Sequence, residues 1–222
     1  MRKYSPPIGW PMQNSKRNRF SMPNEVWAHK LRSIEFMIFS YLCYCQSHNQ
    51  LGDLTLEMIA TNVHSTTNTV KKYIESLISR NLITSEWPLS PSLQRSSYKN
   101  FFTLPNEIFL LKLPPSAFMV YAYLLLIENR KTHTCHPSYN TIAAGTGLSK
   151  NTALKSIDIL LEAGLITVEP SIYFDRRGMK WKGNNLYTIL PIYSAVDIFH
   201  QRQLRQLEID VAKSRLAAQS AV

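Results

Sequence analysis

The segment Phe20-Ser21-Met22-Pro23-Asn24-Glu25-Val26-Trp27 returns 82 residues later as Phe102-Thr103-Leu104-Pro105-Asn106-Glu107-Ile108-Phe109. The similarity continues with one inserted residue, and it aligns further pairs: Phe36-Met37 with Phe118-Met119, Tyr41-Leu42 with Tyr123-Leu124, Asn68-Thr69 with Asn151-Thr152, and Leu82-Ile83-Thr84 with Leu165-Ile166-Thr167. Self-similarity at a fixed period indicates a duplicated structural unit. This period is longer than that of a solenoid repeat, so each unit is large enough to be a small domain with its own core.

Composition favours a polyanionic partner. The 222 residues fit two domains of about 80 residues with tails. The net charge is +10, which points to nucleic acid first and to an anionic membrane second. Residues 1–19 carry five cations and no acid, whereas residues 20–104 are close to neutral.

The cysteines and the hydropathy pattern predict a cytoplasmic protein. Three cysteines, two of them in one apolar run, do not form a disulfide framework. No apolar run approaches the roughly 20 residues that a membrane span needs. The N-terminal cations are not followed by the apolar segment of a secretion signal.

The second copy has the clearer pattern of elements. Helices are expected at residues 117–129, 139–144 and 150–163, separated by a polar connection and by the turn Gly145-Thr146-Gly147. Ser138 and Ser149 can cap the second and third helices. Strands at 165–168 and 185–190 then enclose a basic hairpin tip with glycines where a turn needs them.

The first copy follows the same order. Its helices are expected at 34–47, 55–62 and 67–80, with a hairpin of strands near 82–86 and 98–103. A further helix is expected at 194–217, as a dimer contact or a brace between domains. The predicted fold class is therefore mainly α with small β-hairpins (α+β), divided into an N-terminal arm (1–19), two domains (20–101 and 102–192) and a C-terminal helix and tail (193–222).

The second copy resembles the winged helix-turn-helix. The resemblance is carried by Pro137-Ser138, Ile142-Ala143, Gly147-Leu148-Ser149 with Thr152, and the run Leu160 to Ile166. Together with Leu104-Pro105-Asn106-Glu107-Ile108-Phe109, it is similar to the N-terminal domain of replication initiators from plasmids and integrative elements of low-GC Gram-positive bacteria. The first copy has Asn62-Val63-His64 where the second has its glycine turn. The resemblance implies two tandem winged-helix domains that bind double-stranded DNA.

The third helix of each copy carries the residues expected to read DNA. An α-helix is about 10–12 Å wide and fits the major groove, where each base pair shows a distinct pattern of donors and acceptors. The helix start supplies short polar groups and cations, Asn being suited to adenine and Lys to phosphate or guanine. The candidates are Ser149, Lys150, Asn151, Thr152 and Lys155 in the second copy, and Thr66, Thr67, Asn68, Lys71 and Lys72 in the first. Simple helix capping by the Ser, Thr and Asn residues is the alternative.

Two further basic segments are candidates for backbone contacts. The hairpin tip carries Arg176, Arg177, Lys180 and Lys182, which could straddle a DNA backbone or enter the minor groove. Arg17 and Arg19 belong to the N-terminal arm, which could gain order on DNA. The alternatives are a solvated hairpin and a solubilising leader.

The sequence does not indicate an enzyme. It has no phosphate-binding loop of the Gly-x-x-x-x-Gly-Lys-Ser/Thr type and no His-apolar-His pair, and we expect no metal and no cofactor. Replication initiation leads among the possible roles, with transcriptional regulation close behind. A protein that keeps this fold but binds another protein is the alternative of a different class.

Overall fold

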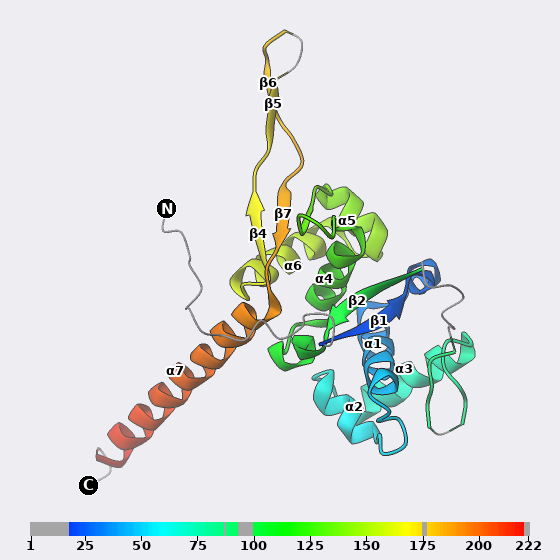
Figure 1. Cartoon of the computed structure of the whole chain (residues 1–222). Helices are drawn as coiled ribbons and strands as arrows, with labels where there is room; N and C mark the ends of the chain where they lie inside the picture. The colour runs from blue at the N-terminus through cyan, green and yellow to red at the C-terminus, as the bar shows by residue number, and fades with distance from the viewer. Residues whose placement is uncertain (1–17, 87, 93–99, 175–176, 220–222) are drawn as a thin grey trace.

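The computed structural model describes residues 18–86, 88–92, 100–174 and 177–219 (Figure 1). The first repeat contains β1 (Arg19–Pro23), η1 (Asn24–His29), α1 (Ser33–Ser47), α2 (Leu56–Asn62) and α3 (Thr67–Ser79). The second contains β2 (Phe101–Pro105), η2 (Asn106–Leu111), α4 (Pro115–Ile127), β3 (Thr134–Cys135), α5 (Tyr139–Thr146), α6 (Lys150–Glu162), β4 (Ile166–Glu169), β5 (Ile172–Phe174), β6 (Lys180–Lys182) and β7 (Leu186–Ile189). The helix α7 (Ile192–Gln219) ends the described chain. The predicted α+β class is confirmed, and the predicted helices agree with these bounds to within about two residues.

Side-chain caps begin the short and third helices of both repeats. The hydroxyls of Thr55, Thr66, Ser138 and Ser149 each accept a hydrogen bond from a backbone N–H three residues on. Such a cap stabilises a helix by about 1 kcal/mol. The first helices, α1 and α4, are apolar on nearly every side and are buried at the centre of the molecule.

The two copies of the repeated segment pair with each other. Strands β1 and β2 form an antiparallel ribbon whose register is centred on Ser21 opposite Thr103. The prediction that residues 98–103 return against residues 82–86 is therefore wrong. The described residues 82–86 and 88–92 are joined by an isolated bridge between Ile83 and Pro91 and form no longer ladder, because proline cannot supply the N–H that a ladder needs.

The ribbon reveals an approximate internal twofold axis. Each contact from the first repeat to the second is matched by a contact between the equivalent residues in the other direction. The ring centroids of Phe20 and Phe109 are 5.9 Å apart and those of Trp27 and Phe102 6.0 Å; those of Tyr41 and Phe109 are 5.1 Å apart and those of Trp27 and Tyr123 5.5 Å. The backbone hydrogen bonds from Asn24 N to Asn100 O and from Asn106 N to Asn18 O are both 3.0 Å long. Phe36 contacts its own counterpart Phe118, with ring centroids 6.1 Å apart. In Figure 1 the α5–α6 pair lies on one side of the ribbon and the α2–α3 pair on the other.

One hydrophobic core spans both repeats. The buried residues of α1, α4, the ribbon and the flanking helices form a single cluster. The period of the repeat suggests a separate core for each copy, but the apolar faces of α1 and α4 are too large to be covered within one repeat. They cover each other, so the repeats form one body.

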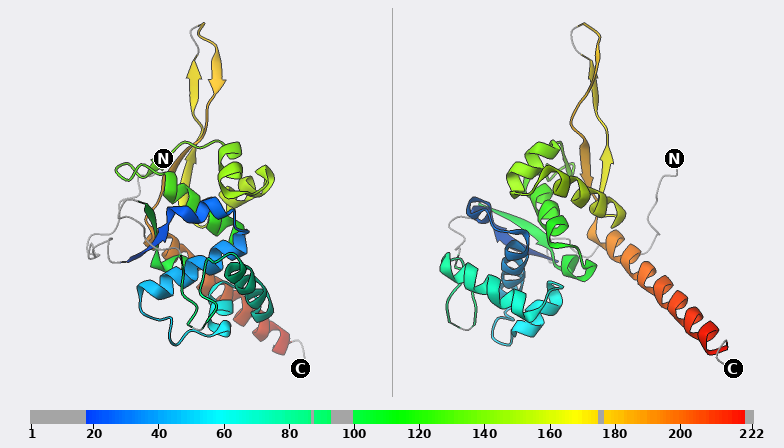
Figure 2. Two further views of the ribbon diagram at one scale, coloured as in Figure 1. Left: turned by 90° about the vertical axis from the view of Figure 1, so that its right-hand side faces the viewer. Right: turned by 180° about the vertical axis from the view of Figure 1, so that it is seen from behind.

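The second repeat alone carries a long hairpin in the part of the chain that is described. Strands β3, β7 and β4 form a small antiparallel sheet in that order, and β5 pairs with β6 beyond it. The hairpin projects from one end of the body and α7 from the other (Figures 1 and 2). Among the described helices, none combines the length and the apolar character that crossing a bilayer requires.

Candidate nucleic-acid interface

A tight turn sets the start of α6. Gly147 lies between α5 and α6 with φ of 71°, a left-handed conformation in which glycine has no steric cost. Ser149 follows as the cap: its Oγ accepts from Thr152 N at 3.1 Å and lies 2.8 Å from Thr152 Oγ1. The turn and the cap together fix the angle at which α6 leaves α5.

One face of α6 anchors the helix and the opposite face is exposed. Ala153, Ile157 and Leu160 are fully buried, and the helix packs on α4. Lys150, Asn151 and Lys155 are exposed, as a reading helix requires. The sequence pattern predicts Leu161 on the same apolar stripe as Ala153, Ile157 and Leu160, but it is 38 % exposed, so that part of the prediction is wrong. Leu154, for which no burial was predicted, is 40 % exposed. Leu154 could have been noticed in the sequence, since it lies outside the apolar stripe and between polar residues.

The start of α3 repeats this arrangement. Thr66 Oγ1 accepts from Thr69 N at 3.2 Å and lies 2.8 Å from Thr69 Oγ1. Asn68, Lys71 and Lys72 are exposed. Lys72 Nζ lies 5.9 Å from the centroid of the Tyr73 ring, within the range of a cation–π contact.

The first turn keeps its geometry without a glycine. His64 occupies the position of Gly147 and has φ of 50°. A left-handed residue with a Cβ costs roughly 1–2 kcal/mol. The His64 ring compensates in part, because its Nε2 lies 3.3 Å from Phe109 O of the other repeat. The turn of the first repeat is therefore left-handed at His64, as the turn of the second repeat is at Gly147.

The predicted residues divide into caps and free side chains. The hydroxyls of Ser149, Thr152 and Thr66 are engaged in caps, as the capping alternative predicts, and Thr67 is half-buried. By contrast, Asn68 and Asn151 make no side-chain hydrogen bond to any described residue. Lys71, Lys150 and Lys155 have no carboxylate partner within the described ranges. These amides and ammonium groups are available to a ligand.

The twofold axis relates the two faces. Asn68 corresponds to Asn151 and Lys72 to Lys155, at the same positions of equivalent helices. A twofold axis places equivalent helices at the same height along it and on opposite sides of it, so the polar face of α3 and that of α6 are related by a half-turn about the ribbon. The prediction from residue types alone proposed both faces but did not include this relation between them.

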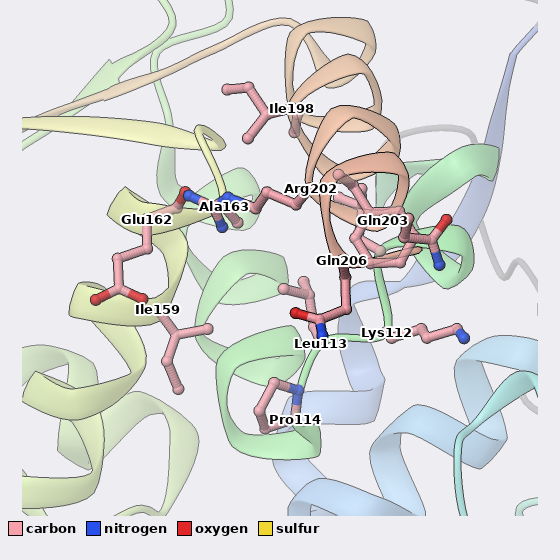
Figure 3. A pocket seen from close by; sticks show the side chains of 13 residues that line it. Lys112, Leu113, Pro114, Ile159, Glu162, Ala163, Ile198, Arg202, Gln203 and Gln206 are labelled. Atoms are coloured by element: carbon pink, nitrogen blue, oxygen red, sulfur yellow. The ribbon is translucent and has the colours of Figure 1, made fainter. Parts of the chain in front are cut away.

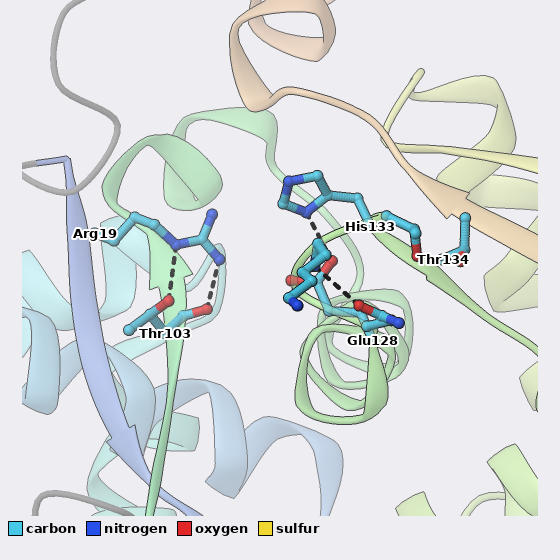
Figure 4. A network of polar contacts seen from close by, with 8 residues as sticks. Arg19, Thr103, Glu128, His133 and Thr134 are labelled. Carbon is cyan, nitrogen blue, oxygen red and sulfur yellow. Dashed lines mark hydrogen bonds and ion pairs between the residues drawn. The ribbon is translucent and has the colours of Figure 1, made fainter.

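The described residues include part of the basic hairpin and the end of the N-terminal arm. Lys180 and Lys182 lie on β6 and Arg177 in the exposed turn before it, far out on the projecting hairpin, whereas Arg176 lies outside the described residues. Arg17 also lies outside them. Arg19 instead clamps the ribbon, donating from Nε to Thr103 Oγ1 at 2.8 Å and from Nη2 to Thr103 O at 2.7 Å (Figure 4). This half-buried guanidinium has a structural role between the repeats.

Helix α7 docks beside the end of α6. Arg202 donates to Glu162 O at 2.6 Å, which satisfies one of the free carbonyls that end α6. Ile198, Arg202 and Gln206 lie around a cavity of about 420 Å³ between α7, α6 and the start of α4 (Figure 3). Among the described residues, no group of three or more His, Cys, Asp or Glu side chains could hold a metal ion.

Comparison with known proteins bears on the second repeat. A family model described as a helix-turn-helix domain matches residues 111–166, which include α4, α5 and α6. No curated protein matches the chain. One solved structure that it resembles is a possible transcriptional regulator from Methanosarcina mazei Go1, at 15% identity and a TM-score of 0.33, with 50% of this chain and 89% of that chain covered.

Proposed function

We propose that this protein binds double-stranded DNA sequence-specifically, with α3 and α6 as its two reading helices. The observation that carries the proposal is the outer face of α6, where Lys150, Asn151 and Lys155 are exposed and have no side-chain partner among the described residues. This face lies beside the turn of the segment that matches a helix-turn-helix family model. The same face recurs on α3. A helix with this face can enter the major groove while its buried side remains on the body.

Different side chains contact the bases and the phosphates. Asn68 and Asn151 can form paired hydrogen bonds with adenine, and the lysines contact phosphates or guanine. The helix starts add partial positive charge toward phosphates. In the second winged-helix unit (102–192) the hairpin serves as the wing, and its cations Arg176, Arg177, Lys180 and Lys182 reach the DNA backbone or minor groove. The first unit (20–101) contributes α3, and the residues of it that the structure describes include no comparable wing.

A regulatory role in replication or transcription suits this chemistry. The resemblance of residues 100–192 to replication initiators favours replication of a plasmid or other mobile element, and transcriptional control uses the same contacts. The near-neutral charge of the first repeat favours a protein partner for that half as a second candidate. In both cases α7 offers a contact for a second copy, because Leu204, Leu207 and Val211 align along its exposed face.

A salt titration with point variants tests DNA binding. If the protein contacts about 6–10 phosphates, log K should fall linearly with log salt with a slope of roughly −5 to −9. Lys155→Ala should reduce that slope by about one. Asn151→Ala should keep the slope and lower discrimination between sites by about 1–3 kcal/mol. Lys213→Ala, an exposed lysine far out on α7, is the matched control.

Binding that does not depend on salt, or that the first two variants leave unchanged, would favour the protein-binding alternative. Sedimentation of the chain cut after Gln203 then tests the homodimer. If the shortened chain is a monomer and its far-UV circular dichroism shows that the remaining residues are still folded, α7 is supported as the dimer contact.

A further inference from the structure

We infer that the DNA target is an imperfect inverted repeat whose two halves differ at the base pair faced by Leu154 in one half and by Lys71 in the other. This inference rests on the proposed DNA binding and adds the architecture of the site to it. It follows from the internal twofold axis and from one difference between otherwise matching helix faces.

The orientation of the half-sites follows from the symmetry of the chain. Strands β1 and β2 run antiparallel about Ser21 and Thr103, and Phe36 contacts its counterpart Phe118. Each third helix then packs on its own first helix, α3 on α1 and α6 on α4. The axis of the ribbon therefore relates α3 to α6. Duplex DNA has twofold axes perpendicular to its length, so equivalent helices on such a protein meet the same sequence on opposite strands.

The spacing between the half-sites is fixed by the shared core. The helices that carry α3 and α6 belong to one buried cluster, with Phe36 and Phe118 at the junction. Among the described residues, α1 and α4, on which α3 and α6 pack, are in direct contact with each other. A site whose halves are moved by half a helical turn, about 5 base pairs, places one half on the wrong face of the DNA.

Over the first nine residues of α3 and α6, the outward-facing positions match except at two; farther along, the exposed Ser79 and Glu162 also differ. Asn68 and Asn151, Thr69 and Thr152, Lys72 and Lys155, and Glu75 and Asp158 are alike in type. Thr67 differs from Lys150 at the first residue of the helix, where backbone phosphate is the expected partner. Lys71 differs from Leu154 in the middle of the exposed face. This second difference lies where base edges are read.

The chemistry of that position predicts different bases. Leu154 is 40 % exposed, one turn on from Asn151 and next to Lys155. An apolar side chain on a reading helix recognises the methyl group of thymine, whereas lysine donates to O6 and N7 of guanine. The half-site read by α6 thus contains a thymine where the half-site read by α3 contains a different base, guanine being the one that Lys71 favours.

Selection of bound duplexes from a random pool tests the inference. The wild-type chain should select two inverted half-sites at one fixed spacing that differ at a single central position. Leu154→Lys should select a site that is symmetric at that position with the base of the α3 half. Lys71→Leu should select the opposite symmetric site, with thymine in both halves. Both residues are exposed, and thermal unfolding of each variant confirms that it folds.

A methyl deletion tests the contact itself. Replacing the selected thymine by uracil removes only the 5-methyl group and should weaken wild-type binding about threefold to fivefold, in line with the burial of one methyl. Leu154→Ala should bind the two DNAs equally. Equal binding by the wild type would overturn the role of Leu154.

The outcomes separate this inference from the proposal on which it rests. The inverted architecture is overturned if the chain selects direct repeats or a single half-site. DNA binding is retained in that case if binding still depends steeply on salt and Asn151→Ala still changes it. Tolerance of a 5-base-pair insertion between the halves also overturns it. Failure to enrich any sequence, without salt-dependent binding, overturns both.

Discussion

At the scale of single residues, equivalent positions of the two repeats meet the same backbone demand in different ways. Gly164 ends α6 with φ of 71°, and its counterpart Asn81 ends α3 with φ of 57°. A Cβ on Gly164 would lie 2.5 Å from Ile198 Cδ1 of α7. Helix α7 lies beside the second repeat at this position and not beside Asn81, and asparagine tolerates the left-handed region. Only the second repeat therefore requires glycine here.

Gly164→Ala is expected to lower the free energy of unfolding by about 1–2 kcal/mol, because alanine is strained at this φ and displaces Ile198. The reverse comparison, Asn81→Gly, should leave stability unchanged or raise it by up to about 1 kcal/mol. Urea unfolding of both variants measures the difference. Equal effects of the two changes would contradict the docking of α7 against Gly164.

Buried thiols predict how stability depends on pH. Burial raises the pKa of Cys45 to about 11 and that of Cys135 to about 12, above the usual value near 9. Well below pH 9 both thiols are protonated in the folded and unfolded chains, so they make stability neither larger nor smaller there. As pH rises from 9 toward 12, the unfolded chain ionises first, so the free energy of unfolding should fall.

Urea unfolding at pH 8, 9.5 and 10.5 measures this loss, and a Cys45→Ala/Cys135→Ala variant should lose less over the same range. Tyrosines contribute above pH 10, since burial raises the pKa of Tyr187 to about 12. Rapid alkylation of all three cysteines in the native protein at pH 8 would show that the thiols are not buried.

At the scale of elements, local signals in the sequence were sufficient for the helices. Caps at Thr66 and Ser149 and the apolar stripe Ala153, Ile157 and Leu160 lie within a few residues of what they determine. The pairing of β1 with β2 joins residues more than 80 positions apart, and nothing local distinguishes it from a hairpin. The sequence showed that Phe20 and Phe102 are equivalent, but not that their strands are partners.

The projecting hairpin offers a prediction for one element. Gly183 N donates to Ser171 O at 2.9 Å, so the chain can be closed there by a two-residue Asn-Gly turn that omits β5, β6 and their cations. The shortened protein should fold, since the sheet of β3, β7 and β4 stays intact. Its salt dependence should be shallower by up to about 4 in slope, one for each cation that contacts phosphate.

The matched control keeps the hairpin length and replaces Lys180 and Lys182 by glutamine. A part of the same reduction is expected, with unchanged thermal stability. If the shortened protein kept the wild-type slope, the hairpin would not contact DNA, and the solvated-hairpin alternative would hold.

At the scale of the whole molecule, the shared core makes the two repeats one cooperative unit. Phe36 and Phe118 are at most 1 % exposed and contact each other across the axis. Phe118→Ala should lower the free energy of unfolding by about 3–5 kcal/mol and destabilise both repeats together. Two separated transitions, with the first repeat unaffected, would show that each repeat folds on its own core.

The central claim is that α3 and α6 of one chain bind one duplex together. Hydroxyl-radical footprinting on a selected site measures this directly, with the wild type beside Asn68→Ala and Asn151→Ala. We expect two protected segments related by inversion about one centre, with Asn68→Ala weakening one of them and Asn151→Ala the other. A single protected segment that Asn68→Ala leaves unchanged would contradict the account.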